Sequence, residues 1–254
     1  MIPKTIHYVW LGDNKKPHLV KKCIASWKKV MPDFQLLCWN EENSPVDVPF
    51  VKEAISVGKY AFPADYIRLY ALYNRGGVYM DTDVFARKSF NDFCSNSFFT
   101  GIEFNEEKFT RLAQESYLNS DGTKKMGDQI IQGLTVQSAI IGSEKENKII
   151  KDCMEYYESN HFILEDGSYN YKFLAPDLIA RVLEKYGFRY KNEFQNLSED
   201  GAVVYPTRYF ASGVNFQNDE NYAVHCYTSS WQDASLLGKM IRKGKYLIKG
   251  LKLK

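Results

Sequence analysis

The chain has 254 residues, 44% of them hydrophobic and 15% aromatic, which is enough to bury one substantial core. Its charges nearly balance at a formal net charge of +2, which argues against intrinsic disorder. The five cysteines lack CxxC pairs and metal-type spacing, so the sequence indicates neither a disulfide scaffold nor a zinc site and favours a reducing compartment.

The first part of the chain predicts a strand, a helix and a second strand. Residues 5–12 (TIHYVWLG) are rich in β-branched and aromatic side chains, residues 17–32 show helical spacing, and residues 34–40 (FQLLCWN) again favour a strand. Two helices follow over residues 49–62 and 63–77, the second with Pro63 near its first turn and Gly76 just past its end.

The rest of the chain continues this alternation. Strands are predicted at residues 77–86, 98–104 and 137–143, helices at 145–159 and 176–186, and short strands at 202–210 and 221–227. Interleaved strands and helices predict an α/β sandwich with a largely parallel central sheet. The polar stretch from Asn105 to Gln129 reads as an insertion or lid, and we expect it to be mobile.

Two aspartates stand out in the segment GVYMDTDVFA, residues 77–86. Because side chains alternate along a strand, Asp81 and Asp83 would share one face, about 7 Å apart, and both could approach one divalent ion if the strand bends or ends there. Hard cations such as Mg²⁺ and Mn²⁺ bind through carboxylates together with the oxygens of a bound phosphate, and ligands of open α/β sheets bind at the carboxyl ends of strands. By itself, however, a DxD pair is weak evidence and is more often two solvated surface acids.

The surrounding string, FPADYIRLYALYNRGGVYMDTDV, closely resembles the sugar-binding DxD region of glycosyltransferase family 32. That family includes capsule and O-antigen sugar transferases, yeast-type mannosyltransferases and relatives of the clostridial glucosylating toxins. IPKTIHYVWLG, CIASWKKVMPDFQLLCWNE and AVHCYTSSW resemble its other recurrent blocks in the expected order, over residues 1–232. The resemblance implies a GT-A type, Rossmann-like nucleotide-sugar transferase fold.

The resemblance also implies roles for particular residues. Asp65 and Arg68 would contact the donor nucleotide, its phosphates or its sugar, although an i,i+3 ion pair explains them as well. Trp10 would stack on the base and Gly12 would allow close backbone approach, whereas a tryptophan in a first strand is usually a core residue. His225 would complete the metal site of Asp81 and Asp83, with an interior histidine as the alternative. Gly77, Ser229, Ser230 and Trp231 are also implied to contact the donor, with packing of the tail as the alternative for Trp231. Asp128 and Gln129 resemble a polar pair that lines the donor sugar in neighbouring retaining families, although loop polarity explains them as well.

The function implied is a metal-dependent retaining glycosyltransferase that uses Mn²⁺ or Mg²⁺. We expect it to move a hexose from a nucleotide sugar, UDP-hexose rather than GDP-mannose, to a saccharide acceptor in capsule or O-antigen synthesis. No side chain is a secure nucleophile, so front-face attack by the acceptor hydroxyl is favoured, with the departing phosphate accepting its proton. Asp128, Gln129 and Trp231 would act in this step.

The last residues form a separate basic segment. Residues 234–254 hold seven Lys and Arg and no acid, which leaves the remainder of the chain at −5 (2 − 7). Leucines and isoleucines interleave with these cations, so residues 233–254 predict a membrane-associating tail following a transferase domain over 1–232, a disordered end being the alternative. With no signal-peptide pattern and no membrane-spanning run, we expect a cytoplasmic protein on the inner face of the membrane.

Such a location suits a lipid-linked acceptor, and no nucleic-acid motif is present.

Two other classes of protein stay open. A phosphohydrolase of the haloacid dehalogenase type also uses DxD, but directly after its first strand and with Thr or Val where this chain has Phe85. A non-enzymatic carbohydrate- or membrane-binding module would need no cluster of acids and histidine around an ion.

Overall fold

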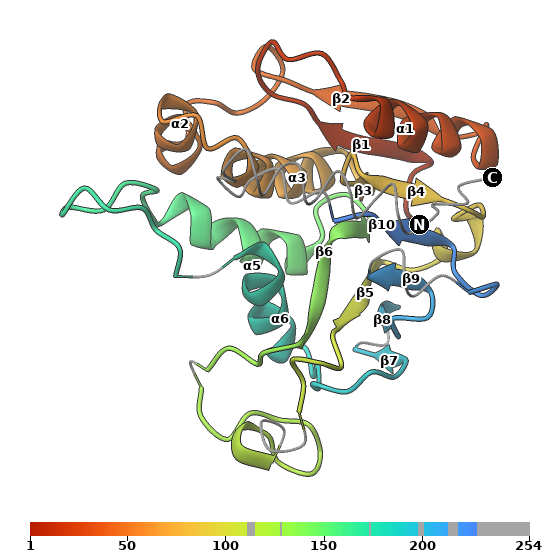
Figure 1. Cartoon of the computed structure of the whole chain (residues 1–254), viewed down its shortest axis with the longest axis vertical. Helices are drawn as coiled ribbons and strands as arrows, with labels where there is room; N and C mark the ends of the chain where they lie inside the picture. Colours follow the sequence, from red (N-terminus) through yellow and green to blue (C-terminus); the bar gives the residue numbers. More distant parts are fainter. Residues whose placement is uncertain (111–114, 128, 173, 198–200, 213–217, 228–254) are drawn as a thin grey trace.

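The predicted segments form the strands and helices of an α/β fold in a computed structural model (Figure 1). The structure describes residues 1–110, 115–127, 129–172, 174–197, 201–212 and 218–227. Asp128, Ser229, Ser230, Trp231 and the basic segment 233–254 therefore lie outside the described residues.

The central sheet has seven strands in the order β2-β1-β3-β6-β5-β8-β7. The parallel and antiparallel pairings give five strands one direction, while β6 and β7 run the other way. The α/β class is confirmed, with a mixed sheet in which the parallel direction predominates. The strands are β1 (Thr5–Val9), β2 (Gln35–Trp39), β3 (Gly77–Met80), β5 (Phe98–Phe104), β6 (Leu134–Ser143), β7 (Gln195–Asn196) and β8 (Ala202–Tyr205).

A second sheet of three short strands corrects two predictions. β4 (Val84–Ala86), β10 (Ala223–His225) and β9 (Phe210–Ser212) pair in that order. The expected single strand over residues 77–86 is therefore two strands in different sheets, joined by a turn at Asp81–Asp83. The expected segment 202–210 divides in the same way between β8 and β9. Both segments are rich in apolar residues on either side of the break, so their hydrophobic pattern does not mark the change of sheet.

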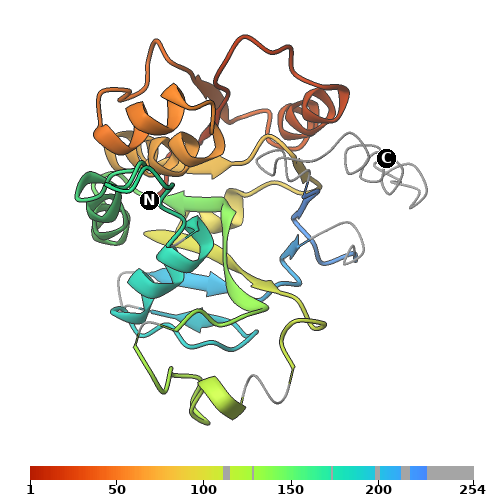
Figure 2. The same ribbon diagram turned by 60° about the vertical axis from the view of Figure 1, so that its left-hand side comes forward.

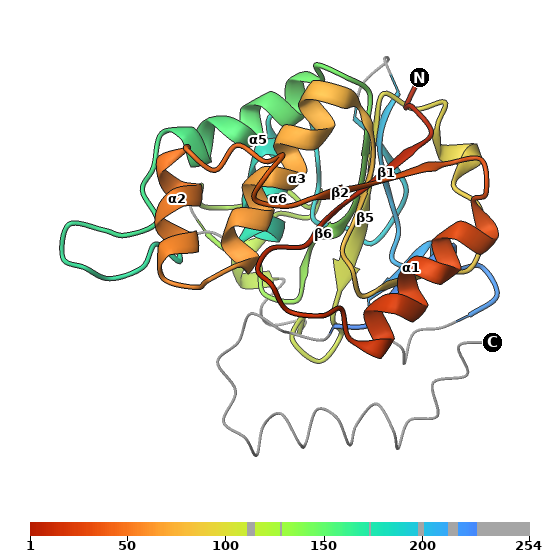
Figure 3. The ribbon, with the colours of Figure 1, turned by 90° about the horizontal axis from the view of Figure 1, so that it is seen from above.

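Helices cover the two faces of the central sheet unequally (Figures 1 and 3). One core contains side chains of α2, α3, α5 and α6 with Tyr79 of β3, whereas Trp27 of α1 packs with Val78 and Met80 in the other. The alternation of Val78, Tyr79 and Met80 between the cores is the period of two expected of a strand. The helices are α1 (His18–Val30), α2 (Pro49–Ser56), α3 (Ala61–Arg75), α5 (Lys148–Glu158) and α6 (Ala175–Glu184).

The connection between β5 and β6 projects from one end of the molecule (Figure 2). Its described residues are joined to the helical part of the fold, since Lys124 forms a 2.6 Å ion pair with Glu184 and the Tyr190 amide donates to the Gly122 carbonyl. The mobility expected of residues 105–129 stays a prediction. None of the helices among the described residues combines the length and apolar character needed to cross a bilayer.

Candidate active site

Asp81 and Asp83 lie in the turn that links β3 to β4, at the carboxyl end of β3. The Asp81 amide donates to the Ala139 carbonyl (2.9 Å), and the Val84 amide closes the turn on the Asp81 carbonyl (2.9 Å). The prediction that strand alternation places the two carboxylates on one face is wrong, because the strand ends at Met80. The turn itself brings them together.

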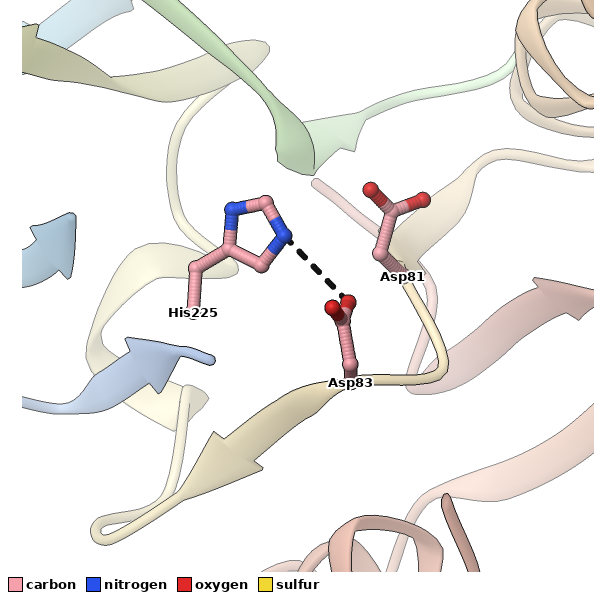
Figure 4. Close-up of side chains that lie close together, drawn as sticks. All are labelled: Asp81, Asp83 and His225. Carbon is pink, nitrogen blue, oxygen red and sulfur yellow. Dashed lines mark ion pairs between the residues drawn. The ribbon is translucent and has the colours of Figure 1, made fainter. Parts of the chain in front are cut away.

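His225 approaches the same turn from β10, whose register pairs His225 with Val84 (Figure 4). Its Nε2 lies 3.2 Å from Asp83 Oδ1, and one ligand atom each from Asp81, Asp83 and His225 lie within 4.8 Å of one another. The Cys226 amide also donates to the Asp83 carbonyl (3.0 Å), which fixes the end of β10 to the turn. The structure thus joins the three residues expected to bind a metal.

The charges around His225 suit a cation. Burial alone would lower the pKa of His225, but the charge of Asp83, the hydrogen bond to it and the charge of Asp81 raise that pKa to about 9. Its Nδ1 is buried without a hydrogen-bond partner among the described residues. Two carboxylates and an imidazole match the donor preferences of Mn²⁺, so these residues fit the ion that the sequence implies. Binding would displace the imidazole proton and would be favoured by higher pH.

Arg68 connects α3 to the aspartate turn. Its Nη2 lies 2.7 Å from Asp65 Oδ1 and 3.5 Å from Asp81 Oδ1, and its Nη1 donates to the Ser138 carbonyl (2.5 Å). The guanidinium lies 4.6 Å from the centre of the Tyr79 ring, whose hydroxyl donates to Asp81 Oδ1 (2.8 Å). Because Arg68 is only 4% exposed, its first role here is to hold Asp81 in place.

Asp65 is unusual among these acids. Burial raises its pKa to about 7, with the charge of Asp81 in the same direction and that of Arg68 opposing it. A carboxyl group with such a pKa exchanges its proton near neutrality and can donate or accept a hydrogen bond. The sequence prediction of a polar contact between Asp65 and the donor is compatible with this position.

Trp10 and Gly12 follow β1, which is the parallel neighbour of β3, so they lie at the same edge of the sheet as the aspartate turn. Trp10 is half-buried, its indole nitrogen donates to the Asn14 carbonyl (2.9 Å), and Lys16 Nζ lies 5.1 Å from its ring. Gly12 has a φ of +76°, and a Cβ there would be 3.5 Å from the Tyr60 ring, an ordinary contact. Gly12 is therefore required by its backbone conformation.

Gly77 does not lie with these residues. Gly77 begins β3, at the end opposite the aspartate turn, and a Cβ there would be 2.6 Å from the Thr5 carbonyl oxygen. The prediction that Gly77 contacts the donor is therefore wrong. Its role is structural, because a residue without a side chain lets β1 and β3 approach closely. Gln129 is half-buried in the loop leading into β6.

Glu103, near the end of β5, was not predicted as a site residue. Since β5 runs parallel to β3, Glu103 lies at the same sheet edge as Asp81. Burial raises its pKa, whereas a hydrogen bond with Tyr227 and the charge of His225 lower it. Asp177 of α6 interacts electrostatically with the same carboxylate. A single acid in the apolar strand FFTGIEF is the signal that could have pointed to Glu103.

Comparison with known proteins identifies similar chains. Residues 17–100 match the family described as "Glycosyltransferase sugar-binding region containing DXD motif". An uncharacterized glycosyltransferase of Acanthamoeba polyphaga mimivirus is 24% identical over 264 residues, covering 98% of this chain and 91% of the viral protein.

Two solved structures are also similar to this chain. The PaToxG glycosyltransferase is 19% identical to this chain, with a TM-score of 0.47. The alignment covers 72% of this chain and 69% of the PaToxG chain. The galactosyltransferase LgtC, solved with donor and acceptor sugar analogs, is 14% identical, covers 94% of each chain and has a TM-score of 0.43.

Proposed function

Because this chain is a glycosyltransferase of the family 32 type, we propose that it transfers a hexose from a UDP-hexose, rather than from GDP-mannose, to a saccharide acceptor with retention of configuration. The observation that supports metal dependence is the convergence of Asp81, Asp83 and His225 at the carboxyl edge of the sheet. Capsule or O-antigen synthesis, with a lipid-linked acceptor, is the pathway that we propose.

Asp81, Asp83 and His225 would hold Mn²⁺ or Mg²⁺. When bound, that ion supplies positive charge for the diphosphate leaving group. Arg68 and Tyr79 keep the Asp81 carboxylate oriented, through the contacts at 3.5 and 2.8 Å. Asp65 would bind hydroxyls of the donor, and Trp10 would stack on its base, a contact worth about 1–3 kcal/mol.

Transfer exchanges one bond at the anomeric carbon for another. The bond from that carbon to the phosphate oxygen breaks as the acceptor oxygen attacks from the same face, and the acceptor proton passes to the departing phosphate. No side chain is covalently modified in this scheme. Asp128, Gln129, Ser229, Ser230 and Trp231 would surround the donor sugar and diphosphate.

We propose that Glu103 binds the acceptor. The residues assigned to the nucleotide come from β1 and α3, whereas Glu103 belongs to β5, on the other side of β3 and β6 in the sheet. Its carboxylate interacts electrostatically with both Asp81 and His225. A carboxylate accepts two hydrogen bonds from hydroxyl groups, so we assign Glu103 to the acceptor sugar.

We also propose that the basic segment 233–254 determines where in the cell the enzyme lies. Its seven cations and interleaved apolar residues would associate with anionic lipid, placing the enzyme on the cytoplasmic face of the inner membrane. Liposome binding that is unchanged by removing residues 236–254 would exclude this role for the segment.

The test of the function is UDP release from individual UDP-sugars in the presence of Mn²⁺. We expect slow donor hydrolysis that stops with excess chelator, returns with Mn²⁺, and falls on the order of 100-fold or more in Asp83→Asn. Asp47→Asn, which changes an exposed acid outside the site, serves as the matched control. Full turnover in chelator would rule out the metal, and phosphate release from simple phosphomonoesters would indicate a hydrolase instead.

A further inference from the structure

Helix α1 carries a continuous basic surface. Residues 15–32 contain six lysines and neither Asp nor Glu. Four of them, Lys21, Lys22, Lys28 and Lys29, are exposed on α1. Because seven residues make about two helical turns, Lys21 and Lys28 form one row and Lys22 and Lys29 a second beside it. The exposed Ala25 lies between them, so no large side chain stands in front of the ammonium groups.

The buried side of α1 is fixed to the strand that follows the aspartate turn. The Trp27 indole donates to the Val84 carbonyl (2.7 Å), and the Ala86 amide donates to Ser26 Oγ (2.9 Å). Trp27 itself is fully buried. Figure 3 shows α1 at the edge of the molecule, apart from α2, α3 and α5. The basic surface is thus rigidly placed relative to Asp83.

A groove of about 480 Å³ lies between α1 and β4. Lys22 and Lys29 line it from the helix and Arg87 from the residue after β4, with Val30 and Phe85 among its apolar residues. Arg87 Nη1 donates to the Asn218 carbonyl, and its Nη2 lies 4.0 Å from the exposed Asp219. The volume is within the range of about 300–1,000 Å³ typical of ligand sites. Three cations around an apolar floor suit a phosphate ester carrying an apolar chain.

The net negative charge of the rest of the chain would orient α1 toward an anionic surface. Residues 15–32 and 234–254 hold 6 and 7 of the 33 Lys and Arg and no acid, so the remainder has 20 against 31 Asp and Glu, a net charge of −11. An anionic surface therefore attracts α1 and repels most of the remaining chain. Among the exposed residues of α1 the one ring is the imidazole of His18 at its first position, so this face lacks the row of aromatic side chains on which successive bases of a single strand stack.

We propose that the exposed face of α1, together with the α1–β4 groove, is a docking surface for an anionic phospholipid bilayer, with a lipid phosphate in the groove. Phe85 and Arg87 of the groove are two and four residues beyond Asp83, so docking would place the catalytic edge near the lipid surface. The surface is independent of the segment 233–254, which it would supplement. It does not depend on the identity of the donor or the acceptor.

The test is co-sedimentation of the full chain with vesicles of phosphatidylcholine alone and of equal parts phosphatidylcholine and phosphatidylglycerol. We expect binding only to the anionic vesicles, weakening with salt. The double variant Lys22→Glu/Lys29→Glu should lose on the order of 30-fold or more in affinity. Lys148→Glu/Lys151→Glu makes the same charge change at exposed positions of α5 and should stay within about threefold. The far-UV circular dichroism and the thermal unfolding of both variants should match those of the natural protein, which shows that they are folded.

Three results would overturn the proposal. Equal losses in the two double variants would mean that only total charge matters. Lys22→Glu/Lys29→Glu could bind anionic vesicles as well as the natural protein does, while deletion of residues 236–254 abolishes binding. That result would assign docking to the deleted segment alone. Displacement of the protein from vesicles by a short single-stranded oligonucleotide, with the same dependence on Lys22 and Lys29, would assign the surface to nucleic acid.

Discussion

Glu103 and His225 show how single side chains acquire their chemistry from neighbours distant in the sequence. His225 has a raised pKa because it faces Asp83, in spite of its burial. Glu103 has a raised pKa because it is buried, in spite of Tyr227 and His225. The two groups approach one aspartate turn from different strands, His225 as an expected metal ligand and Glu103 as the residue assigned to the acceptor.

Glu103→Gln should separate transfer from donor hydrolysis. Losing one charge-assisted hydrogen bond to an acceptor hydroxyl costs about 1.5–3 kcal/mol, or roughly 10- to 100-fold in transfer. UDP release to water should fall no more than about threefold, because the nucleotide residues are untouched. Both rates are measured with the donor and acceptor that a substrate panel identifies. Glu106→Gln, at an exposed position, is the control, and equal losses in transfer and hydrolysis would place Glu103 on the donor instead.

At the scale of elements, the junction between α3 and β3 holds the strand that leads into the aspartate turn in place. α3 ends at Gly76 with a φ of 63°, and Gly77 follows with a φ of 116°. His7 of β1 spans the junction: its Nδ1 accepts from the Trp39 indole (3.1 Å), so Nε2 carries the proton and donates to the Gly76 carbonyl (2.7 Å). This network links β2 and β1 to the start of β3, the end of that strand opposite the aspartate turn.

Gly77→Ala should destabilise the fold beyond the cost of a positive φ. A Cβ at Gly77 would be 2.6 Å from the Thr5 carbonyl oxygen and 2.9 Å from His7 Nε2. Gly58, with a φ of +70° and nothing within 4 Å of an added Cβ, is the matched control, because Gly58→Ala adds only conformational strain. We expect Gly77→Ala to lower the free energy of unfolding in urea by about 1–3 kcal/mol more than the control does. An equal decrease in the free energy of unfolding for Gly77→Ala and Gly58→Ala would show that β1 and β3 can move apart to accommodate the added methyl group.

The prediction of the elements succeeded where the hydrophobic period is unambiguous. α1, α3 and β5 appear where residues 17–32, 63–77 and 98–104 predicted them, because their apolar positions repeat with a helical or strand period. It failed at residues 77–86, where apolar residues continue through a change of sheet. The reversed direction of β6 was also missed, since periodicity carries no information about strand direction.

For the molecule as a whole, the buried His7 of the central sheet makes one contribution to stability that depends on pH. Burial lowers the pKa of His7 from 6.5 to about 4, in spite of its hydrogen bond to Gly76. Between these pKa values the unfolded chain binds more protons than the folded one, so the contribution of His7 is fully present above pH 6.5 and declines as the pH falls toward 4.

Comparing the protein with His7→Gln isolates this effect from the other titrating groups. The variant lacks the imidazole, so the stability advantage of the natural protein should be about 2 kcal/mol smaller near pH 5 than near pH 7.5. Urea unfolding of both proteins at the two pH values measures the difference. A constant advantage would mean that His7 is already protonated in the folded state or titrates normally there.

The sequence alone determined the α/β class, the order of most elements, the resemblance to family 32 and the residue types expected to bind a metal. These follow from local patterns: hydrophobic period, turn residues and short motifs. Only the tertiary structure decided that a turn, not a strand face, presents Asp81 and Asp83, that β10 brings His225 to them, and that Glu103 shares their edge. Such contacts depend on strand order and direction, which form between residues far apart in the chain and leave no periodic signal in it.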